Sequence, residues 1–343
     1  MDNQRSRDSF PAVTTHILAE HKDEVWNIQW SHCGRYLASA SRDKTAIPET
    51  GPNTRVCVPE KILRDHPYPV TCLAWSFDDS ILLAGSENTI KMWNPKTGRC
   101  LHALDACTET ITSLVWLVDG SGFLSASLDR KIILWGADGI QREVWGTAVM
   151  RITDLAVTPD SSRLVAVGVR HLPPSENNSA GGTPPTGAAT QAYTVGHGDV
   201  ENRLIIYNLA TKEQETSIRL EGELTTVNIS QDSRYALIHH APDEVQLWDL
   251  DLAQMVHRFT GLHQGKHVIR SSFGGADGEF VVSGSEDGKV YVWNRDTAAL
   301  LAALPGHGEG RSVNAAVWNP KDERMFASCS DDGTIRIWEI PSL

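Results

Sequence analysis

Leu304-Pro305-Gly306-His307 opens the stretch of sequence that decides the fold. It continues through Val313-Asn314-Ala315-Ala316-Val317-Trp318 to Met325-Phe326-Ala327-Ser328-Cys329-Ser330, and it ends with Asp331-Asp332-Gly333-Thr334-Ile335-Arg336-Ile337-Trp338. Three short runs of alternating or apolar residues are separated by turn residues. This pattern predicts a meander of three antiparallel β-strands that begins after a Gly-His pair and ends at a tryptophan.

Four side chains of this stretch are expected to hydrogen-bond with one another. His307 precedes the first strand, Ser328 lies in the second, Asp332 lies in the tight turn after it, and Trp338 ends the third. An aspartate accepts from a histidine N–H, a histidine nitrogen bonds a serine hydroxyl, and that hydroxyl accepts from an indole N–H. A His-Ser-Asp set is also compatible with catalysis, but its recurrence at regular spacing along the chain favours a structural role.

Related meanders recur along the whole chain. Their closing aromatic residues are Trp93, Trp135, Tyr207, Trp248, Trp293 and Trp338. The successive spacings are 42, 72, 41, 45 and 45 residues, and the long one is one repeat plus about 30 inserted residues. A period of roughly 40 to 45 residues is typical of the four-stranded blades of a β-propeller. Together with a first repeat that lacks its closing tryptophan, the pattern predicts an all-β, seven-bladed propeller.

The two ends of the chain are expected to meet in one blade. Residues 1–12 have the composition of a disordered, solvated tail, and the propeller is expected to span residues 13–343. Val13 to Leu18 has the pattern of a strand, but no meander precedes it, and the chain stops just after the third strand of the last repeat. Val13 to Leu18 is therefore expected to form the outermost strand of the last blade, which closes the ring.

Several repeats depart from the common pattern. In the first, residues 48–52 contain two prolines, so either the third strand is short and irregular or the gene model is wrong here. In the second, Ala84 occupies the serine position, and the third repeat has no opening histidine. The fourth contains an insertion, residues 171–201, with too few large apolar residues to fold by itself. We expect it to hang over the narrow top face of the ring, and a solvated expansion without a role is favoured over a gate.

The composition predicts an intracellular protein whose partners are proteins. The net charge is −12 and no basic run is present, so nucleic acid is not expected as a partner. The six cysteines show no CxxC pairing, which indicates small core residues in a reducing compartment. We find no signal peptide and no apolar run long enough for a bilayer, so no membrane partner is expected. Cytoplasmic residence is expected, with nuclear residence left open.

Some segments resemble WD repeats, and one resembles a particular group of them. Gly284-Ser285-Glu286-Asp287-Gly288-Lys289-Val290-Tyr291-Val292-Trp293 and the stretch that ends at Trp338 carry elements of WD repeats in general. More distinctive is Gly261-Leu262-His263-Gln264-Gly265-Lys266-His267-Val268-Ile269-Arg270-Ser271-Ser272-Phe273-Gly274-Gly275. With Glu20-His21-Lys22-Asp23-Glu24-Val25-Trp26, it resembles the propeller of the WD-repeat subunit of the GID/CTLH ubiquitin-ligase complex. The resemblance extends from Thr15 to Ile340.

This resemblance implies a non-catalytic subunit of a multi-subunit ubiquitin ligase. Such subunits help to assemble the complex into a larger ring, and their propellers recruit substrates or regulators for proteasomal degradation. The implied partners are other ligase subunits and the recruited proteins. The family carries helical LisH and CTLH segments before the propeller, whereas this chain has no stretch of helical periodicity. The chain is therefore either truncated or a propeller-only form that binds without oligomerising.

The top face of a propeller is built from loops of every blade, and it is the expected contact surface. An aromatic residue beside mixed charges is the composition of an interface anchor, although for any one residue ordinary surface or packing is the favoured role. The candidate contacts, at the starts of first strands or just before a turn aspartate, are Trp26, Arg42, Tyr68, Glu87, Arg270, Glu286, Asn314 and Asp331.

Other functions are weighed against this one. Receptors of cullin-type ligases also use WD propellers and often carry Trp-Asp-x-Arg at a strand end, but Trp248-Asp249-Leu250-Asp251 ends in aspartate here. A scaffold in another complex is a further alternative. For an enzyme, we find no nucleophile elbow, glycine-rich phosphate loop or Cys/His ligand spacing. Catalytic residues, metals, cofactors and small-molecule substrates are therefore not expected.

Overall fold

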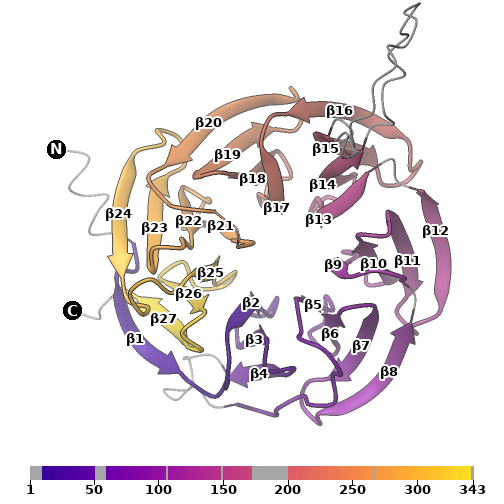
Figure 1. Ribbon diagram of the computed structural model, residues 1–343, viewed down its shortest axis with the longest axis horizontal. Coiled ribbons are helices and arrows are strands. Elements are labelled where there is room, and N and C mark those ends of the chain that lie inside the picture. Colours follow the sequence, from indigo (N-terminus) through magenta and orange to yellow (C-terminus); the bar gives the residue numbers. More distant parts are fainter. Residues whose placement is uncertain are drawn as a thin grey trace, which may run out of the picture.

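A computed structural model of the chain describes residues 10–50, 59–105, 107–147, 150–171, 200–265 and 267–340. Within these residues, seven antiparallel sheets surround a central axis like the blades of a propeller (Figure 1). The predicted all-β, seven-bladed propeller is confirmed. No helix in the described part of the chain is long and apolar enough to span a bilayer.

The first four blades follow the order of the chain. Blade 1 contains β2 (Val25–Trp30), β3 (Tyr36–Ser41) and β4 (Ala46–Thr50). Blade 2 contains β5 (Cys72–Trp75), β6 (Leu82–Ser86), β7 (Thr89–Asn94) and β8 (Arg99–Asp105). Blade 3 contains β9 (Ile111–Trp116), β10 (Gly122–Ser127), β11 (Lys131–Gly136) and β12 (Gln141–Thr147). Blade 4 contains β13 (Arg151–Val157), β14 (Arg163–His171), β15 (Val200–Asn208) and β16 (Gln214–Leu220).

The last three blades complete the ring. Blade 5 contains β17 (Glu223–Ile229), β18 (Tyr235–Ala241), β19 (Glu244–Asp249) and β20 (Gln254–Thr260). Blade 6 contains β21 (Ser271–Gly274), β22 (Phe280–Ser283), β23 (Lys289–Asn294) and β24 (Leu300–Pro305). Blade 7 contains β25 (Val313–Trp318), β26 (Met325–Ser330), β27 (Ile335–Glu339) and β1 (Val13–Leu18).

The hydrophobic core lies between the blades. Seven clusters of buried residues each join two neighbouring blades, so every junction around the ring has its own core. The second strand of a blade packs against neighbours on both faces, and all six residues of β26 are buried. Such strands carry nearly continuous runs of small and apolar residues, because neither face meets water.

The ring closes through the N-terminal strand, as predicted. β1 pairs antiparallel with β27, from Val13 opposite Glu339 to Leu18 opposite Ile335 (Figure 1). The prediction that the tail extends to residue 12 is wrong at its end, because Phe10 is only 5% exposed. Its ring lies 5.9 Å from that of Phe280, within the core between blades 6 and 7. A single phenylalanine in a polar segment has no periodicity that would mark it as buried. Residues 1–9 lie outside the described residues.

Blade 1 has a short third strand despite its prolines. β4 pairs with β3, and Pro48 lies opposite Ala38. Proline has no N–H group to donate to a neighbouring strand. It is tolerated here because, among the described residues, β4 is contacted on its outer side by isolated bridges and not by a continuous strand. There, Glu60 N donates to Pro48 O over 2.9 Å. A short third strand is thus present as far as Thr50, while residues 51–58 lie outside the described residues.

Candidate protein-interaction surface

The turns that lead into the first strands, and those between second and third strands, lie at the same end of the blades. We call this end the top face. The described ends of β14 and β15, His171 and Val200, meet here as opposite residues of one hairpin. The insertion predicted over the top face therefore starts and ends there. Residues 172–199 lie outside the described residues, so its predicted position stays a prediction.

The hydrogen-bond set of blade 7 ties two top-face turns together. His307 Nδ1 lies 3.1 Å from Asp332 Oδ2, and Nε2 lies 2.7 Å from Ser328 Oγ. Trp338 Nε1 donates to the same hydroxyl over 2.8 Å. Although burial alone would raise it, hydrogen bonds from His307 and Thr334 hold the pKa of Asp332 well below its usual range. The four side chains expected to form this set are thus joined in the structure, and they fix loop geometry.

Other blades keep parts of this set. In blade 1, His21 Nε2 lies 2.8 Å from Ser39 Oγ, and Nδ1 lies 3.0 Å from Asp43 Oδ2. In blade 3, Trp135 Nε1 donates to Ser125 Oγ over 2.9 Å. The same contacts recur in several blades, with different members missing in different blades, and this recurrence is what a structural role predicts.

Blade 2 lacks a hydroxyl at the centre of its set. Ala84 occupies the serine position, as the sequence indicates, and it is fully buried. The two ring nitrogens of His66 and the indole N–H of Trp93 are buried and have no hydrogen-bond partner in the described chain. Burial lowers the pKa of His66 to about 4, so the imidazole is neutral at physiological pH.

In blade 1, a glutamate occupies the place of the closing tryptophan. Glu49 follows Asp43 by the same number of residues that separates Trp338 from Asp332. It is 1% exposed, and neither carboxyl oxygen has a hydrogen-bond partner among the described residues. Burial raises its pKa to about 8, with a smaller contribution from Glu20. The sequence indicated that the closing tryptophan is missing but not which residue replaces it, because the two prolines left the course of this strand open.

The candidate contact residues come from four consecutive blades of the ring, 6, 7, 1 and 2, and we call this part of the top face the contact arc. In blade 1, Glu24 holds two of them together. Trp26 Nε1 donates to Glu24 Oε2 over 2.9 Å, and Arg42 Nη1 donates to Oε1 over 2.8 Å. The Trp26 side chain is half-buried and Arg42 is exposed. The indole and the guanidinium are therefore presented side by side with little freedom.

Blades 2 and 6 contribute three further members of the contact arc. Tyr68 is 48% exposed at the entrance to blade 2, and Glu87 is exposed beside the same blade. Glu286 of blade 6 has a partly structural role, because its Oε1 accepts from the backbone N–H groups of Gly265 and His267 at 2.7 and 2.9 Å.

Asn314 and Arg270 differ from the other candidate contacts, because the first is buried and the second lines the central cavity. Asn314 is 2% exposed, so its predicted role as an exposed contact is wrong; its Nδ2 donates to Asp331 Oδ1 over 2.7 Å. Burial, and then Glu24, raise the pKa of Asp331. Arg270 lies in the central channel, where its Nη1 donates to Asp154 Oδ2 over 3.0 Å. The sequence did not reveal this pairing, because the partners belong to blades 4 and 6.

A ring of polar links around the axis was missed by the sequence analysis. At six junctions, a side chain near the start of a first strand donates to a carbonyl of the next blade; the donors are Asn27, Thr71, Thr112, Thr153, Thr226 and Asn314. At the junction of blades 6 and 7, backbone bonds of Arg270 take this role. The available signal was a threonine or asparagine at this position in successive repeats. The links hold the seven top-face loops at fixed distances from one another.

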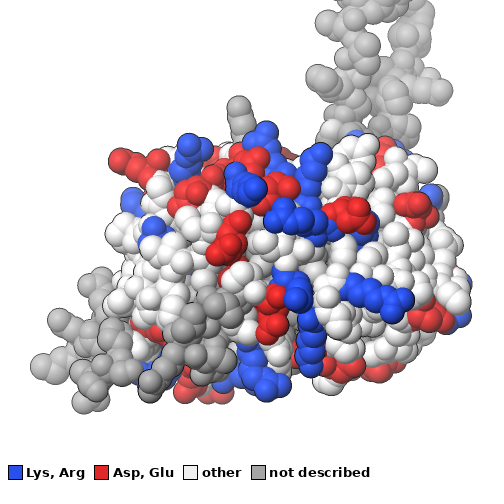
Figure 2. Space-filling view, turned by 90° about the horizontal axis from the view of Figure 1, so that it is seen from below, with Lys and Arg blue, Asp and Glu red and all other residues white. Residues whose placement is uncertain are grey.

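The ring of first strands encloses a central channel with a cavity of about 390 Å³. Its lining is mostly amide, hydroxyl and aliphatic side chains, and it includes the Asp154–Arg270 ion pair. On the side of the molecule shown in Figure 2, acidic and basic side chains are interspersed with one another, and uncharged areas lie between them. Interspersed charges suit a protein partner better than a polyanion.

The distinctive stretch Gly261 to Gly275 mainly organises the junctions of blades 5, 6 and 7. Gln264 is buried; its Oε1 lies 3.0 Å from His239 Nδ1, and its Nε2 donates to Thr225 Oγ1 over 3.2 Å. Gly274 lies against the indole of Trp318, so close that a Cβ would be 1.9 Å from a ring carbon. Gln264 and Gly274, which belong to the stretch that carries the resemblance, therefore have roles in packing and hydrogen bonding between blades.

Comparison with known proteins agrees with this geometry. The model of the family described as "WD domain, G-beta repeat" matches residues 12–47, 57–94, 98–136, 263–294 and 298–339. The chain belongs to the WD-repeat family. The unmatched region, residues 137–262, covers blades 4 and 5, and neither has a serine at the centre of its set.

Similar proteins include named members of this family. The WD repeat-containing protein WDS homolog of Arabidopsis thaliana is 36% identical over 84% of this chain and 50% of its own length. The Arabidopsis thaliana WD repeat-containing protein 26 homolog is 33% identical over 84% of this chain and 44% of its own length. GID complex subunit 7 of Schizosaccharomyces pombe is 34% identical over 84% of this chain and 51% of its own length. This WD-repeat chain spans about half the length of these relatives. The resemblance stated from the sequence is confirmed by the identity to GID complex subunit 7 and to the WD repeat-containing protein 26 homolog.

Proposed function

We propose that this WD-repeat protein is a non-catalytic subunit of a GID-type ubiquitin ligase that recruits substrates or regulators for proteasomal degradation. The observation that carries the proposal is the 34% identity to GID complex subunit 7, which extends over 84% of this chain. In this proposal, the propeller of the chain holds a recruited protein in place within the complex. The same proposal places the protein in the cytoplasm, with the nucleus as a second site of action.

The recruiting surface in this proposal is the contact arc. Trp26 and Tyr68 would act as its apolar anchors, because partly exposed aromatic side chains contribute much of the binding energy in protein interfaces. Arg42, Glu87, Glu286 and Asp331 surround them with charges of both signs, which would set the orientation of the partner. The ring of polar links supports this role, because loops that are already ordered lose little conformational entropy on binding.

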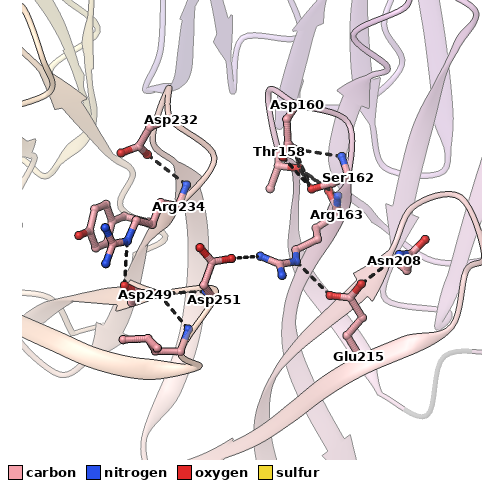
Figure 3. Close-up of polar contacts among 12 residues, drawn as sticks. Thr158, Asp160, Ser162, Arg163, Asn208, Glu215, Asp232, Arg234, Asp249 and Asp251 are labelled. Atoms are coloured by element: carbon pink, nitrogen blue, oxygen red, sulfur yellow. Dashed lines mark hydrogen bonds and ion pairs between the residues drawn. The ribbon is translucent and has the colours of Figure 1, made fainter.

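The competing role as a receptor for a cullin-type ligase is not supported by the sequence motif Trp-Asp-x-Arg, because the chain departs from this motif at its last position. In Trp248-Asp249-Leu250-Asp251 the last position holds Asp251, whose Oδ1 accepts from Arg163 Nη1 of blade 4 over 2.6 Å. Figure 3 shows Arg163 between Asp251 and Glu215, with Arg234 bound to Asp249. An acidic side chain already paired within the propeller stands where such receptors often carry an exposed arginine.

Affinity purification of the tagged chain from its own cells, followed by identification of the bound proteins, tests the proposal. RING-type and CTLH-containing subunits are expected among them. The double variant Trp26→Ala/Tyr68→Ala should lose recruited proteins while the remaining ligase subunits stay bound. Recovery of cullin adaptors in place of CTLH-containing subunits would contradict the proposal. Ubiquitin transfer by the purified chain alone would contradict its non-catalytic part.

A further inference from the structure

A cluster of arginines lies on blade 4, away from the contact arc. It consists of Arg170 on β14, Arg203 on β15 and Arg219 on β16, arranged around Glu201. Arg170 lies opposite Glu201 in the sheet, and Arg203 lies opposite Arg219. Cross-strand partners share one face of a sheet, as do residues two apart on a strand, so all four side chains lie on the same face. We call them the arginine cluster.

This face is the one directed toward blade 3. Ile205 follows Arg203 by two residues and therefore shares its face, and Ile205 belongs to the core between blades 3 and 4. The core ends where Arg203 and Glu201 replace the apolar residues of β15. The arginine cluster thus lies on the wall of the propeller, above the core of this junction and toward the top face.

Glu201 fixes two of the three guanidinium groups. Its Oε2 accepts from Arg203 Nη2 over 2.7 Å and from Nε over 3.1 Å, and its Oε1 lies 3.1 Å from Arg219 Nη1. Arg203 also donates to Ser217 Oγ over 2.8 Å. Hydrogen bonds from Arg203 hold the pKa of Glu201 below its usual range. The carboxylate is nearly buried, so these side chains form a pre-ordered frame.

The arginine cluster has more positive charge than its structural role requires. Among the described residues, one carboxylate faces three guanidinium groups, which leaves two positive charges in excess. Like charges directly opposite each other in a sheet are destabilising, as for Arg203 and Arg219. The Arg219 side chain is 64% exposed, and within the described part of the chain only its Nη1 lies within ion-pair distance of an acidic oxygen. Arg170 makes no hydrogen bond or ion pair within the described part of the chain. This local excess of positive charge contrasts with the net charge of −12 of the full sequence.

We propose that the arginine cluster binds an anionic side-chain group, a phosphate monoester or a carboxylate, on a segment of a partner protein. Arg170 and Arg219 would contact the anion, and Arg203 with Glu201 would position Arg219. Guanidinium groups bind both anions through two parallel hydrogen bonds, and arginines spaced on a rigid sheet keep that geometry. This inference is independent of the function proposed above, because it uses another surface and other residues.

Fluorescence anisotropy with the full chain and labelled peptides tests the proposal. One peptide carries phosphoserine, a second carries a run of glutamates, and two others carry serine and glutamine at the same positions. The chain should bind the phosphoserine peptide, the glutamate peptide or both, and neither neutral peptide. Which anionic peptide binds more tightly identifies the source of the anion. Binding should weaken as salt is added, because exposed charges are screened.

The double variant Arg170→Gln/Arg219→Gln should weaken binding at least about tenfold, since it removes charge-assisted hydrogen bonds. It keeps Arg203, so Glu201 remains paired, and an unchanged melting temperature verifies the fold. Arg64→Gln/Arg99→Gln removes the same charge from exposed positions elsewhere on the wall and should leave binding unchanged. Absence of binding to both anionic peptides would overturn the proposal. So would equal weakening in the two double variants, or tighter binding of an RNA oligonucleotide than of either peptide.

Discussion

Replacement of Glu49 by glutamine should remove a large part of the pH dependence of folding stability. Glu49 occupies the place of a closing tryptophan, is 1% exposed, and has no hydrogen-bond partner among the described residues. A buried carboxyl group without a partner binds its proton tightly, because the charged form would lose its hydration. Burial raises the pKa to about 8 from an ordinary value of 4.5.

The sign and size of the effect follow from this shift. The folded pKa lies above the unfolded one, so the stability contribution is complete below about pH 4.5 and is lost as the pH rises through about 8. The difference of 8 − 4.5 = 3.5 pH units corresponds to about 5 kcal/mol in total. Of this, about 2.5 kcal/mol should be lost between pH 5 and pH 7.

Urea denaturation of the natural chain and of Glu49→Gln at pH 5, 6, 7 and 8 measures this effect. Other titrating groups are common to both proteins, so they cancel in the difference between the two free energies of unfolding. Between pH 5 and pH 7, the difference should shift by about 2.5 kcal/mol in favour of the glutamine variant. Glu309→Gln, at an exposed position, is the matched control and should show a constant difference. Parallel curves for the natural chain and Glu49→Gln would refute the reasoning.

Three further substitutions test the hydrogen-bond sets and the ring closure. Ala84→Ser should give the orphaned nitrogens of His66 and Trp93 a partner and raise the stability by about 1 kcal/mol, seen as a melting temperature about 2 °C higher; an unchanged or lower value counts against the missing-hydroxyl argument. Ser328→Ala should leave two buried nitrogens unpaired and lower the free energy of unfolding by about 2 kcal/mol in urea denaturation; a loss below about 0.5 kcal/mol would argue against the set. Phe10→Ala should cost about 3 kcal/mol in the same assay, because the ring fills a core between two blades; an unchanged midpoint would show that the segment before β1 contributes nothing.

The fold could be predicted from the sequence because its signals are local and repeated. Strand periodicity, turn residues and a closing aromatic such as Trp338 recur often enough to predict seven blades, and an unpaired strand at Val13 to Leu18 indicates ring closure. Phe10 was missed because one apolar residue in a polar segment has no period. The course of the third strand of blade 1 was left open, since a proline usually argues against a strand and only the pairing of β4 with β3 settles the register.

The contact residues were predicted less well, for a physical reason. Position near the start of a first strand brings a side chain to the top face but does not determine whether it points to solvent. Asn314 bonds to its neighbour blade and Arg270 to an aspartate across the channel, while Trp26 and Arg42 remain on the surface. These differences depend on long-range contacts between blades, which no single repeat encodes.

The central claim is that the propeller recruits another protein through the contact arc without catalysing a reaction itself. Its most direct test is the binding of purified recruited protein, identified by affinity purification, to the natural chain and to Trp26→Ala/Tyr68→Ala in isothermal titration calorimetry. The account predicts that the double variant, with an unchanged melting temperature, binds at least about tenfold more weakly. Equal affinity of the two proteins would contradict it.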